Sequence, residues 1–216
     1  MNKTDSKNQL CQLHLVRHGQ TEWNQQHRFQ GHQDSPLTKE GIAQAKQLAQ
    51  KLHDVQFDAV YSSDLDRAKR TADIISLEQD IAVTTTALLR ERYLGALEGK
   101  TRQELSDKLQ TLLEHLDEIK TAQHQADADH RIEPLDHLHH RTITFLRQTA
   151  IAHPGEKVLV VTHGGVIGHL LISLGYQNLK SYFQLNIDNL SSVILKSDGV
   201  DFFIEETIGI EVKPII

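Results

Sequence analysis

Two apolar runs in the sequence end in a histidine followed by glycine, at residues 16–19 (VRHG) and 161–165 (VTHGG). Each run has the form of a β-strand that leads into a loop. Glycines at such a point let the backbone turn sharply, and the free N–H groups of a following helix attract an anion. With Arg17 beside His18 at one strand end and His163 at the other, the pattern predicts a concave anion-binding site.

A third strand end offers a second candidate cation. Residues 61–63 (YSS) lead into an expected helix whose first turn carries Arg67. In open α/β sheets, ligands bind outside the carboxyl ends of the strands. Taken singly, a strand-end histidine is usually hydrogen-bonded to nearby backbone, and a first-turn arginine is usually solvated. The predicted site therefore depends on these segments converging.

The rest of the chain alternates between patterns typical of helices and of strands. Thr38 is the expected N-cap of a helix over about 39–52, and Ser63 with Asp66 forms the expected capping box of the next helix. The run 157–162 (KVLVVT) is β-branched without alternation, which is typical of a parallel strand covered on both faces. Further strands are expected at 10–16, 58–61 and 82–86, and further helices at 104–122 and 166–174.

Two runs near the end of the chain, 191–196 and 200–206, predict an antiparallel hairpin at the edge of the sheet. The expected fold class is therefore α/β, a three-layer sandwich with a mostly parallel central sheet, an antiparallel edge and helices on both faces. The chain has neither an internal repeat nor a linker rich in Gly, Ser or Pro. We expect a single domain over 1–216, with a helical lid-like insertion at about 100–141.

The composition argues against several classes of protein. Hydrophobic residues make up 38% and charged residues 24% of the chain, which is typical of neither a disordered nor a membrane protein. No apolar run approaches the roughly 20 residues that span a bilayer, and we expect no signal peptide because segment 1–10 is polar. The net charge of −6 argues against a dedicated nucleic-acid binder. Because the one cysteine cannot form an internal disulfide, we expect a cytoplasmic location.

The residues around the two histidines resemble a known family. Residues 15–24 (LVRHGQTEWN) are similar to the opening motif of the histidine phosphatase superfamily, which includes the cofactor-dependent phosphoglycerate mutases. Separate blocks in family order over about 13–168 argue strongly against a chance match. The further blocks are 28–31 (RFQG), 34–41 (DSPLTKEG), 62–68 (SSDLDRA), 89–92 (LRER), 98–99 (EG) and 161–165 (VTHGG).

The resemblance implies a phosphate clamp around a nucleophile. His18 is the implied nucleophile, a neutral imidazole that becomes phosphorylated. Arg17 and Arg67 are implied to grip the phosphoryl oxygens with their planar, permanently charged groups. His163, protonated or donating a hydrogen bond, completes the clamp together with the helix start at Gly164.

The resemblance also implies an acid and two neutral donors. Glu91 protonates the departing alkoxide and then helps water to attack the phosphohistidine. Asn24 and Gln30 donate hydrogen bonds to the same phosphoryl oxygens. Phosphoryl transfer needs positive charge around these oxygens, and two arginines and a histidine can supply it without Mg²⁺. We therefore expect no metal and no cofactor.

Two other patterns are weaker signals. Residues 95–101 (GALEGKT) resemble a P-loop but have three residues between the glycines where four are required. The fourteen histidines include a cluster, His137, His139 and His140, that lacks the ligand spacing of a typical metal site. We expect neither nucleotide triphosphate nor metal binding, and the role of the His-rich segment 124–140 stays open.

The resemblance leaves three functions to be separated. The expected one is a metal-independent phosphatase that hydrolyses phosphate monoesters of small metabolites through a phosphohistidine intermediate. The alternatives are a cofactor-dependent phosphoglycerate mutase and a non-catalytic phosphate-binding protein on the same fold. Gln30, the residues at 95–99 and the short segment 100–141 favour hydrolysis, because the mutases typically differ at each of these places.

The identity of the substrate stays open. Family phosphatases often carry Gly-Glu-Ser where this chain has residues 131–135 (RIEPL), and Glu133 is the only residue that matches. We expect a small phosphorylated metabolite as the partner, with no nucleic acid and no membrane. The chain is expected to be a monomer or a homodimer.

Overall fold

The computed structural model of the chain describes residues 10–77, 79–107, 110, 132–178 and 184–213. Among these residues, six strands form one sheet in the order β3-β2-β4-β1-β5-β6. The pairs β1–β4, β4–β2 and β2–β3 are parallel, whereas β5 and β6 run antiparallel at one edge. The strands are β1 (Cys11–Arg17), β2 (Ala59–Ser63), β3 (Val83–Thr86), β4 (Lys157–Thr162), β5 (Leu185–Ser197) and β6 (Phe202–Val212).

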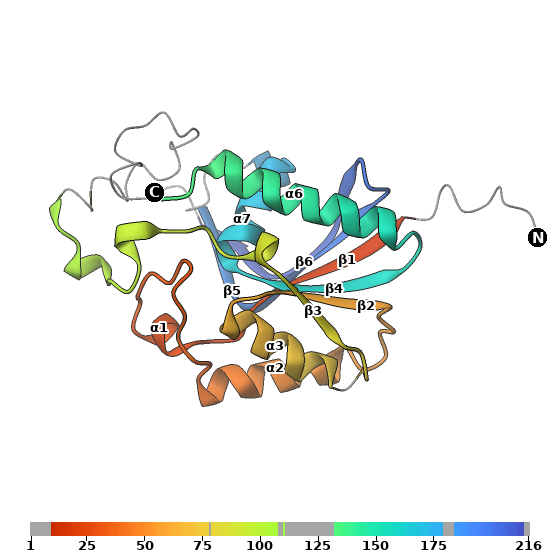
Figure 1. Cartoon of the computed structure of the whole chain (residues 1–216), viewed down its shortest axis with the longest axis horizontal. Helices are drawn as coiled ribbons and strands as arrows, with labels where there is room; N and C mark the ends of the chain where they lie inside the picture. The colour runs from red at the N-terminus through yellow and green to blue at the C-terminus, as the bar shows by residue number, and fades with distance from the viewer. Residues whose placement is uncertain (1–9, 78, 108–109, 111–131, 179–183, 214–216) are drawn as a thin grey trace, which may run out of the picture.

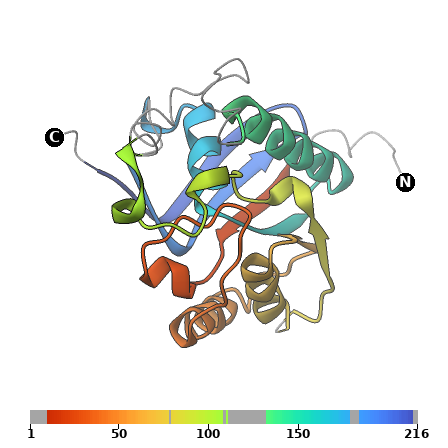
Figure 2. The same cartoon turned by 60° about the vertical axis from the view of Figure 1, so that its left-hand side comes forward.

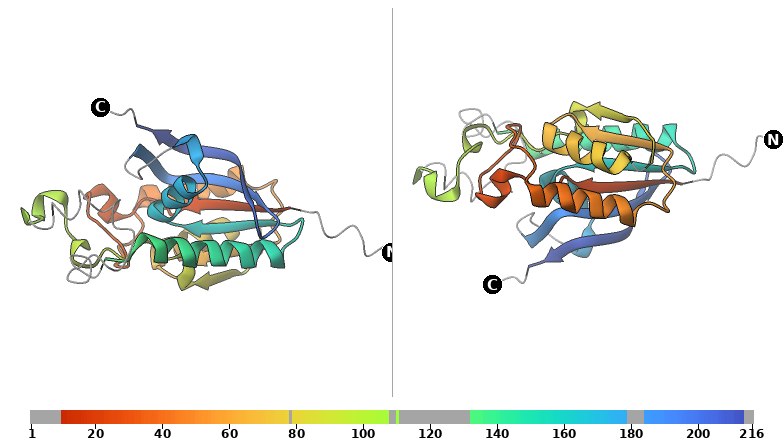
Figure 3. Two further views of the ribbon diagram at one scale, coloured as in Figure 1. Left: turned by 90° about the horizontal axis from the view of Figure 1, so that it is seen from above. Right: turned by 90° about the horizontal axis from the view of Figure 1, so that it is seen from below.

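Helices cover both faces of this sheet, which confirms the predicted three-layer α/β sandwich (Figure 1, Figure 3). On one face lie α2 (Lys39–Lys51) and α3 (Asp66–Ser76), and on the other lie α6 (Leu135–Ala152) and α7 (Gly164–Ser173). The short elements are α1 (Glu22–Gln25) and 3₁₀ turns at Ala87–Leu89, Gly95–Leu97, Arg102–Glu104 and Tyr176–Asn178.

Each face of the sheet has its own hydrophobic core. Leu13 and Val160 pack in the cluster under α6 and α7, whereas Val16 and Leu159 pack in the cluster under α2 and α3. The residues at 158–161 of β4 all have 0% of their surface exposed. Burial on both faces explains why this run has no apolar–polar alternation.

The antiparallel hairpin is present and longer than predicted. β5 begins at Leu185, six residues before the predicted start, and pairs with β6 across an irregularity between Ile187 and Ser192. Within this irregularity Leu190 has a left-handed backbone with φ of 61°. The interruption breaks the period of two that a strand pattern needs, so the sequence did not reveal the first half of β5.

The predicted capping box of α3 is wrong. The N-cap position is Leu65, whose side chain makes no cap, and the Ser63 hydroxyl instead accepts the Leu65 N–H at 3.3 Å. The cap is the carboxylate of Asp34, which accepts the N–H of Asp66 at 2.7 Å and lies 3.5 Å from that of Arg67. A capping group from a distant loop leaves no local signature in the sequence.

The register of β1 and β4 brings the two histidines together. Arg17 pairs with Thr162, and the N–H of His18 donates to the carbonyl oxygen of Thr162 at 2.9 Å. The next residues, His18 and His163, therefore leave neighbouring strands side by side. In Figure 1 these strand ends lie on the left, as do α1 and the yellow-green segment that follows β3.

Part of the prediction falls outside the described residues. Most of the expected helix at 104–122 and most of the lid-like insertion at 100–141 lie there, so these features and the single-domain assignment stay predictions. None of the helices that the structure describes is both long and apolar enough to cross a membrane.

Candidate active site

His18 lies in the loop after β1 and is buried, with 3% of its surface exposed. Its Nδ1 donates to the carbonyl oxygen of Gly19 at 2.8 Å, which makes Nε2 the unprotonated nitrogen of the neutral ring. Burial holds the pKa of His18 well below its usual 6.5, and the charges of Arg67 and Arg17 lower it further. The residue is therefore a neutral imidazole whose Nε2 carries a lone pair.

His163 is the second imidazole of the site. Its ring centroid lies 5.2 Å from that of His18, with the ring planes at 61°. Burial, followed by the nearby charge of Arg67, holds the pKa of His163 well below 6.5. Both ring nitrogens are buried, and neither has a hydrogen-bond partner among the described residues. A buried polar group of this kind is expected to bind an anion or water in the functioning site.

This result modifies one expectation about His163. We expected the ring to be protonated or to donate a hydrogen bond. Burial, followed by the surrounding positive charge, opposes protonation. A phosphoryl dianion would act in the opposite direction, because a negative charge nearby favours the charged imidazolium. The structure therefore favours His163 as a neutral donor before substrate binds.

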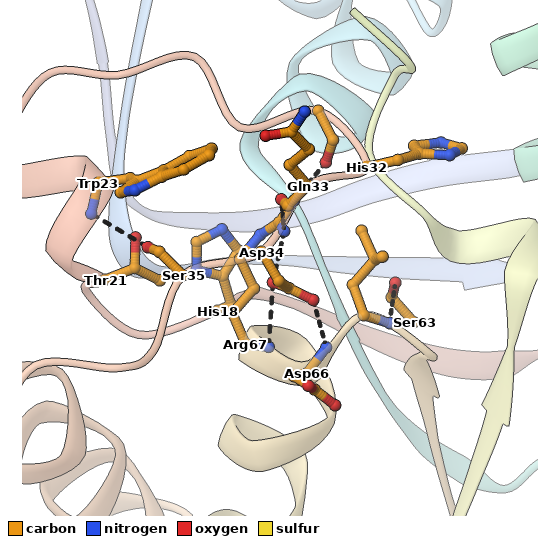
Figure 4. A network of polar contacts seen from close by, with 12 residues as sticks. His18, Thr21, Trp23, His32, Gln33, Asp34, Ser35, Ser63, Asp66 and Arg67 are labelled. Atoms are coloured by element: carbon orange, nitrogen blue, oxygen red, sulfur yellow. Dashed lines mark hydrogen bonds and ion pairs between the residues drawn. The ribbon is translucent and has the colours of Figure 1, made fainter. Parts of the chain in front are cut away.

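Arg67 is rigidly held inside the protein. The side chain is fully buried, and Nη1 donates to the carbonyl oxygen of Gln33 at 2.9 Å and to the Asp34 carboxylate at 2.6 Å. Nη2 donates to the carbonyl oxygen of Gly31 at 2.7 Å, while the buried Nε has no partner among the described residues. Figure 4 shows the Asp34 carboxylate bound to backbone N–H groups at the start of α3. These contacts hold the guanidinium of Arg67 in place and leave its Nε–H as a donor for an oxyanion.

Arg17 reaches the site from the last position of β1. Its Nη1 donates to the carbonyl oxygen of Ile187 in β5. Its Nε lies close to the first residue of α7, since a Cβ added to Gly164 would be 3.2 Å from it. Glycine at position 164 therefore lets the guanidinium approach the helix start, where backbone N–H groups also attract an anion.

Glu91 lies beside the strand end that carries His163. Its carboxylate accepts the N–H of Gly165 at 2.9 Å and the N–H of Arg92 at 2.8 Å. A Cβ added to Gly165 would lie 2.3 Å from Glu91 Oε1, so only glycine allows this approach. The structure thus places a carboxyl group at the start of α7, the helix that follows His163.

Asn24 and Gln30 differ in how they are held. The Oδ1 of Asn24 accepts from the Thr21 N–H at 3.0 Å and from Asn189 Nδ2 at 3.3 Å, which turns the Asn24 amide nitrogen away from these contacts. Gln30 is buried, and its Oε1 has no partner among the described residues. Asn189 also donates to the carbonyl oxygen of His18 at 3.0 Å. The sequence pattern did not indicate a role for Asn189, because this residue lies in the irregular part of β5.

The P-loop-like segment, residues 95–101, carries a buried carboxylate that binds backbone N–H groups, which the sequence did not reveal. Its Glu98 carboxylate is 8% exposed and accepts the backbone N–H groups of His32 and Leu94, each at 2.9 Å, and of Gln33 at 3.1 Å. Figure 2 shows this segment beside the loop that carries α1. Arg67 donates to carbonyl oxygens of the same loop, so Glu98 indirectly supports the position of Arg67.

The histidine cluster on α6 takes no part in this arrangement. The ring of His139 lies 6.1 Å from that of His140 and 6.3 Å from that of His169 on α7. Within the described ranges, no group of three or more His, Cys, Asp or Glu side chains could hold a metal ion. His124 and His130 lie outside the described residues.

Comparison with known proteins agrees with this fold. The family model of the histidine phosphatase superfamily, branch 1, matches residues 13–207. Phosphoglycerate mutase-like protein 4 of Arabidopsis thaliana is 40% identical over 162 residues, which are 74% of this chain and 69% of that protein. A metal-independent phosphoserine phosphatase of the same plant is 37% identical over 163 residues, covering 74% and 67% of the two chains. The solved structure of Bacillus stearothermophilus YhfR superposes with a TM-score of 0.80 at 32% identity, over 90% of this chain and 95% of that one.

The carboxyl ends of the parallel strands β1 and β4 bring two buried histidines together, and Arg17 and Arg67 place positive charge near them. The chain belongs to the histidine phosphatase superfamily, branch 1. Its enzyme class is that of the phosphoric monoester hydrolases.

The two buried histidines predict a loss of stability in acid. Folding lowers the pKa of both His18 and His163, so below about pH 6.5 the unfolded chain binds protons that the folded chain does not. The stabilisation is therefore present above the unfolded pKa and decreases as the pH falls. Each histidine should lower the free energy of unfolding by about 1.4 kcal/mol per pH unit below the unfolded pKa.

Urea unfolding between about pH 7.5 and pH 5 measures this slope. His163→Asn should show a shallower dependence than the unsubstituted protein, because it removes one of the histidines whose pKa folding lowers, a group that also includes His14. His53→Asn changes a histidine whose side chain is 69% exposed, and it should keep the original slope. Equal slopes in all three proteins would contradict the prediction.

Proposed function

We propose that the chain hydrolyses phosphate monoesters of small metabolites through a phosphohistidine formed on His18. The observation that carries this proposal is the buried neutral ring of His18. Its Nδ1–H is bound to a backbone carbonyl, so Nε2 is the nucleophilic nitrogen, and the charges of Arg17 and Arg67 act on the same ring. A nucleophile in this setting meets an anionic phosphate in a region of positive potential.

In the first step, His18 Nε2 attacks phosphorus and the bond from phosphorus to the ester oxygen breaks. Arg67, held by the loop carbonyls, and Arg17 stabilise the charge on the three equatorial oxygens. The N–H groups at the start of α7 and the neutral His163 add further donors. Glu91, in its protonated form, transfers its proton to the leaving alkoxide.

In the second step, Glu91 acts as a base. It takes a proton from a water molecule, whose oxygen attacks the phosphorus of phosphohistidine. The bond from phosphorus to Nε2 breaks, inorganic phosphate leaves, and both Glu91 and His18 return to their starting forms. No metal ion or redox partner is needed to balance either step.

A phosphoglycerate mutase would share the first step and differ in the second. It would return the phosphoryl group to a bound phosphoglycerate instead of water. The named relatives include a mutase-like protein and a phosphoserine phosphatase. Gln30 and the segment 95–99 support hydrolysis. The candidate substrates are small sugar phosphates, phosphoglycerate, α-ribazole phosphate and phosphoserine.

A screen of phosphomonoesters in excess EDTA tests the proposal. We expect free phosphate from at least one small substrate, with a rate that EDTA leaves unchanged, because guanidinium groups supply the positive charge. A metal-dependent phosphatase assayed in parallel should lose its activity. 3-Phosphoglycerate, primed with a bisphosphoglycerate, is scored for both its isomer and free phosphate. Loss of activity in EDTA would refute metal independence, and isomer without phosphate would favour the mutase.

The remaining expectations are part of the same proposal. A cytoplasmic location is supported by the single cysteine, Cys11, which is buried in the core. The proposed partner is a small phosphorylated metabolite, and the chain is proposed to act as a monomer or a homodimer.

A further inference from the structure

Arg141 of α6 uses all five of its N–H groups within the protein. Nε and Nη2 donate to the two carboxylate oxygens of Glu133 at 2.7 and 2.8 Å. Nη1 donates to the carbonyl oxygens of Leu88 at 2.8 Å and Arg90 at 2.5 Å, and Nη2 donates to that of Glu91 at 2.9 Å. One guanidinium thus holds three carbonyls of the segment that ends at the proposed acid.

This ion pair is largely shielded from solvent. The side chains of Arg141 and Glu133 are 16% and 15% exposed. A paired guanidinium with every donor satisfied is far more rigid than a surface arginine. Lysine would keep the positive charge, but its three donors do not form the planar fork that reaches a carboxylate and three carbonyls together.

Glu133 holds the same segment beyond the acid. Its N–H donates to the carbonyl oxygen of Tyr93 at 2.8 Å, and its carboxylate accepts the Tyr93 N–H at 3.2 Å. Its carbonyl oxygen accepts from Arg92 Nε at 2.7 Å. The backbone is therefore fixed on both sides of Glu91, whose carboxylate meets the Gly165 N–H at 2.9 Å.

We propose that Arg141, oriented by Glu133, is the positioning residue for Glu91. Arg141 does not touch the reacting atoms; it holds the backbone from which the acid extends. The inference rests on the proposed function, because it assumes that Glu91 donates a proton to the leaving group. A displacement of about 1 Å at a catalytic group can cost on the order of 100-fold in rate, so a loss of this clamp should be measurable.

A purely structural role for Arg141 has a different signature. Weaker docking of α6 would lower the stability and reduce the rate for every substrate to a similar extent. A misplaced acid would slow only those substrates whose leaving groups need a proton. The ratio of kcat/KM for an alkyl phosphate to that for an aryl phosphate separates these cases, since kcat/KM reports the steps up to departure of the leaving group.

Arg141→Lys is the primary test, because lysine retains the charge that acts on His163. We expect kcat/KM to fall about 100-fold for an alkyl phosphate and by less than about 3-fold for an aryl phosphate. Arg147→Lys is the matched control on the same helix, since Arg147 is exposed and, among the described residues, its hydrogen bond is to the Val200 carbonyl at 3.5 Å. It should change neither value. In a Glu91→Gln background, Arg141→Lys should cause little further loss.

Glu133→Gln provides a second variant in which Arg141 itself remains. It should lower kcat/KM selectively for the alkyl phosphate, by less than Arg141→Lys does. Its vanadate affinity should stay close to that of the unsubstituted protein. Equal losses for both substrates, or full additivity with Glu91→Gln, would overturn the positioning role. Retained activity in His18→Ala would instead refute the proposed function, so the two failures are distinguishable.

Discussion

Replacement of His18 by alanine should lower the hydrolysis of an aryl phosphate by about 10⁴-fold or more, while the protein stays folded. The loss is expected because the variant has no Nε2 to attack phosphorus, and a good leaving group cannot compensate for a missing nucleophile. The smaller side chain adds no charge to the core. Release of the aryl alcohol measures the rate, and circular dichroism with thermal unfolding verifies the fold.

His14 provides the control for this substitution. It lies on β1, the strand that leads to His18, is also buried, and packs edge-on against the ring of Phe57. Its replacement by glutamine should leave most of the activity. The unsubstituted protein, quenched during turnover, should also contain a phosphoramidate that is labile in acid and stable in alkali. Undiminished activity in His18→Ala, or a phosphorylated residue other than His18, would disprove the mechanism.

Replacement of Glu91 by glutamine should slow alkyl phosphates by about 10²- to 10⁴-fold in kcat/KM, and aryl phosphates far less. An alkoxide is a poor leaving group and needs the proton that glutamine cannot supply, whereas a phenolate leaves without it. The amide can still accept the N–H of Gly165 through its oxygen, so the geometry around the second strand end should persist.

The two steps of the reaction can be separated in this variant. Loss of the base should slow hydrolysis of the phosphohistidine, so an aryl phosphate should give a burst of aryl alcohol followed by a slow steady rate. Glu40→Gln, which changes an exposed carboxylate in the first turn of α2, should behave like the unsubstituted protein. Equal losses of kcat/KM for both substrate classes would remove Glu91 from the role of acid.

Relations between residues close in sequence were predictable. The strand–histidine–glycine runs at the carboxyl ends of β1 and β4 are such relations, and the Thr38 cap of α2 is another. They depend on periodicity, on turn residues and on hydrogen bonds that span three or four positions. A linear pattern therefore contains the information that determines them. The pattern of parallel strands also indicated that the strand ends would meet at one edge of the sheet.

The supports of the site were decided by tertiary structure alone. Asp34, not Ser63, caps α3, and Glu98 holds the loop that grips Arg67. Arg141 reaches the acid segment from 50 residues away. Each contact joins segments that only the folded sheet brings together. A buried carboxylate or guanidinium in such a place satisfies backbone groups that no neighbour in the sequence can reach. The chain sequence thus determined which groups could react, and the packing of distant loops determined how firmly they are held.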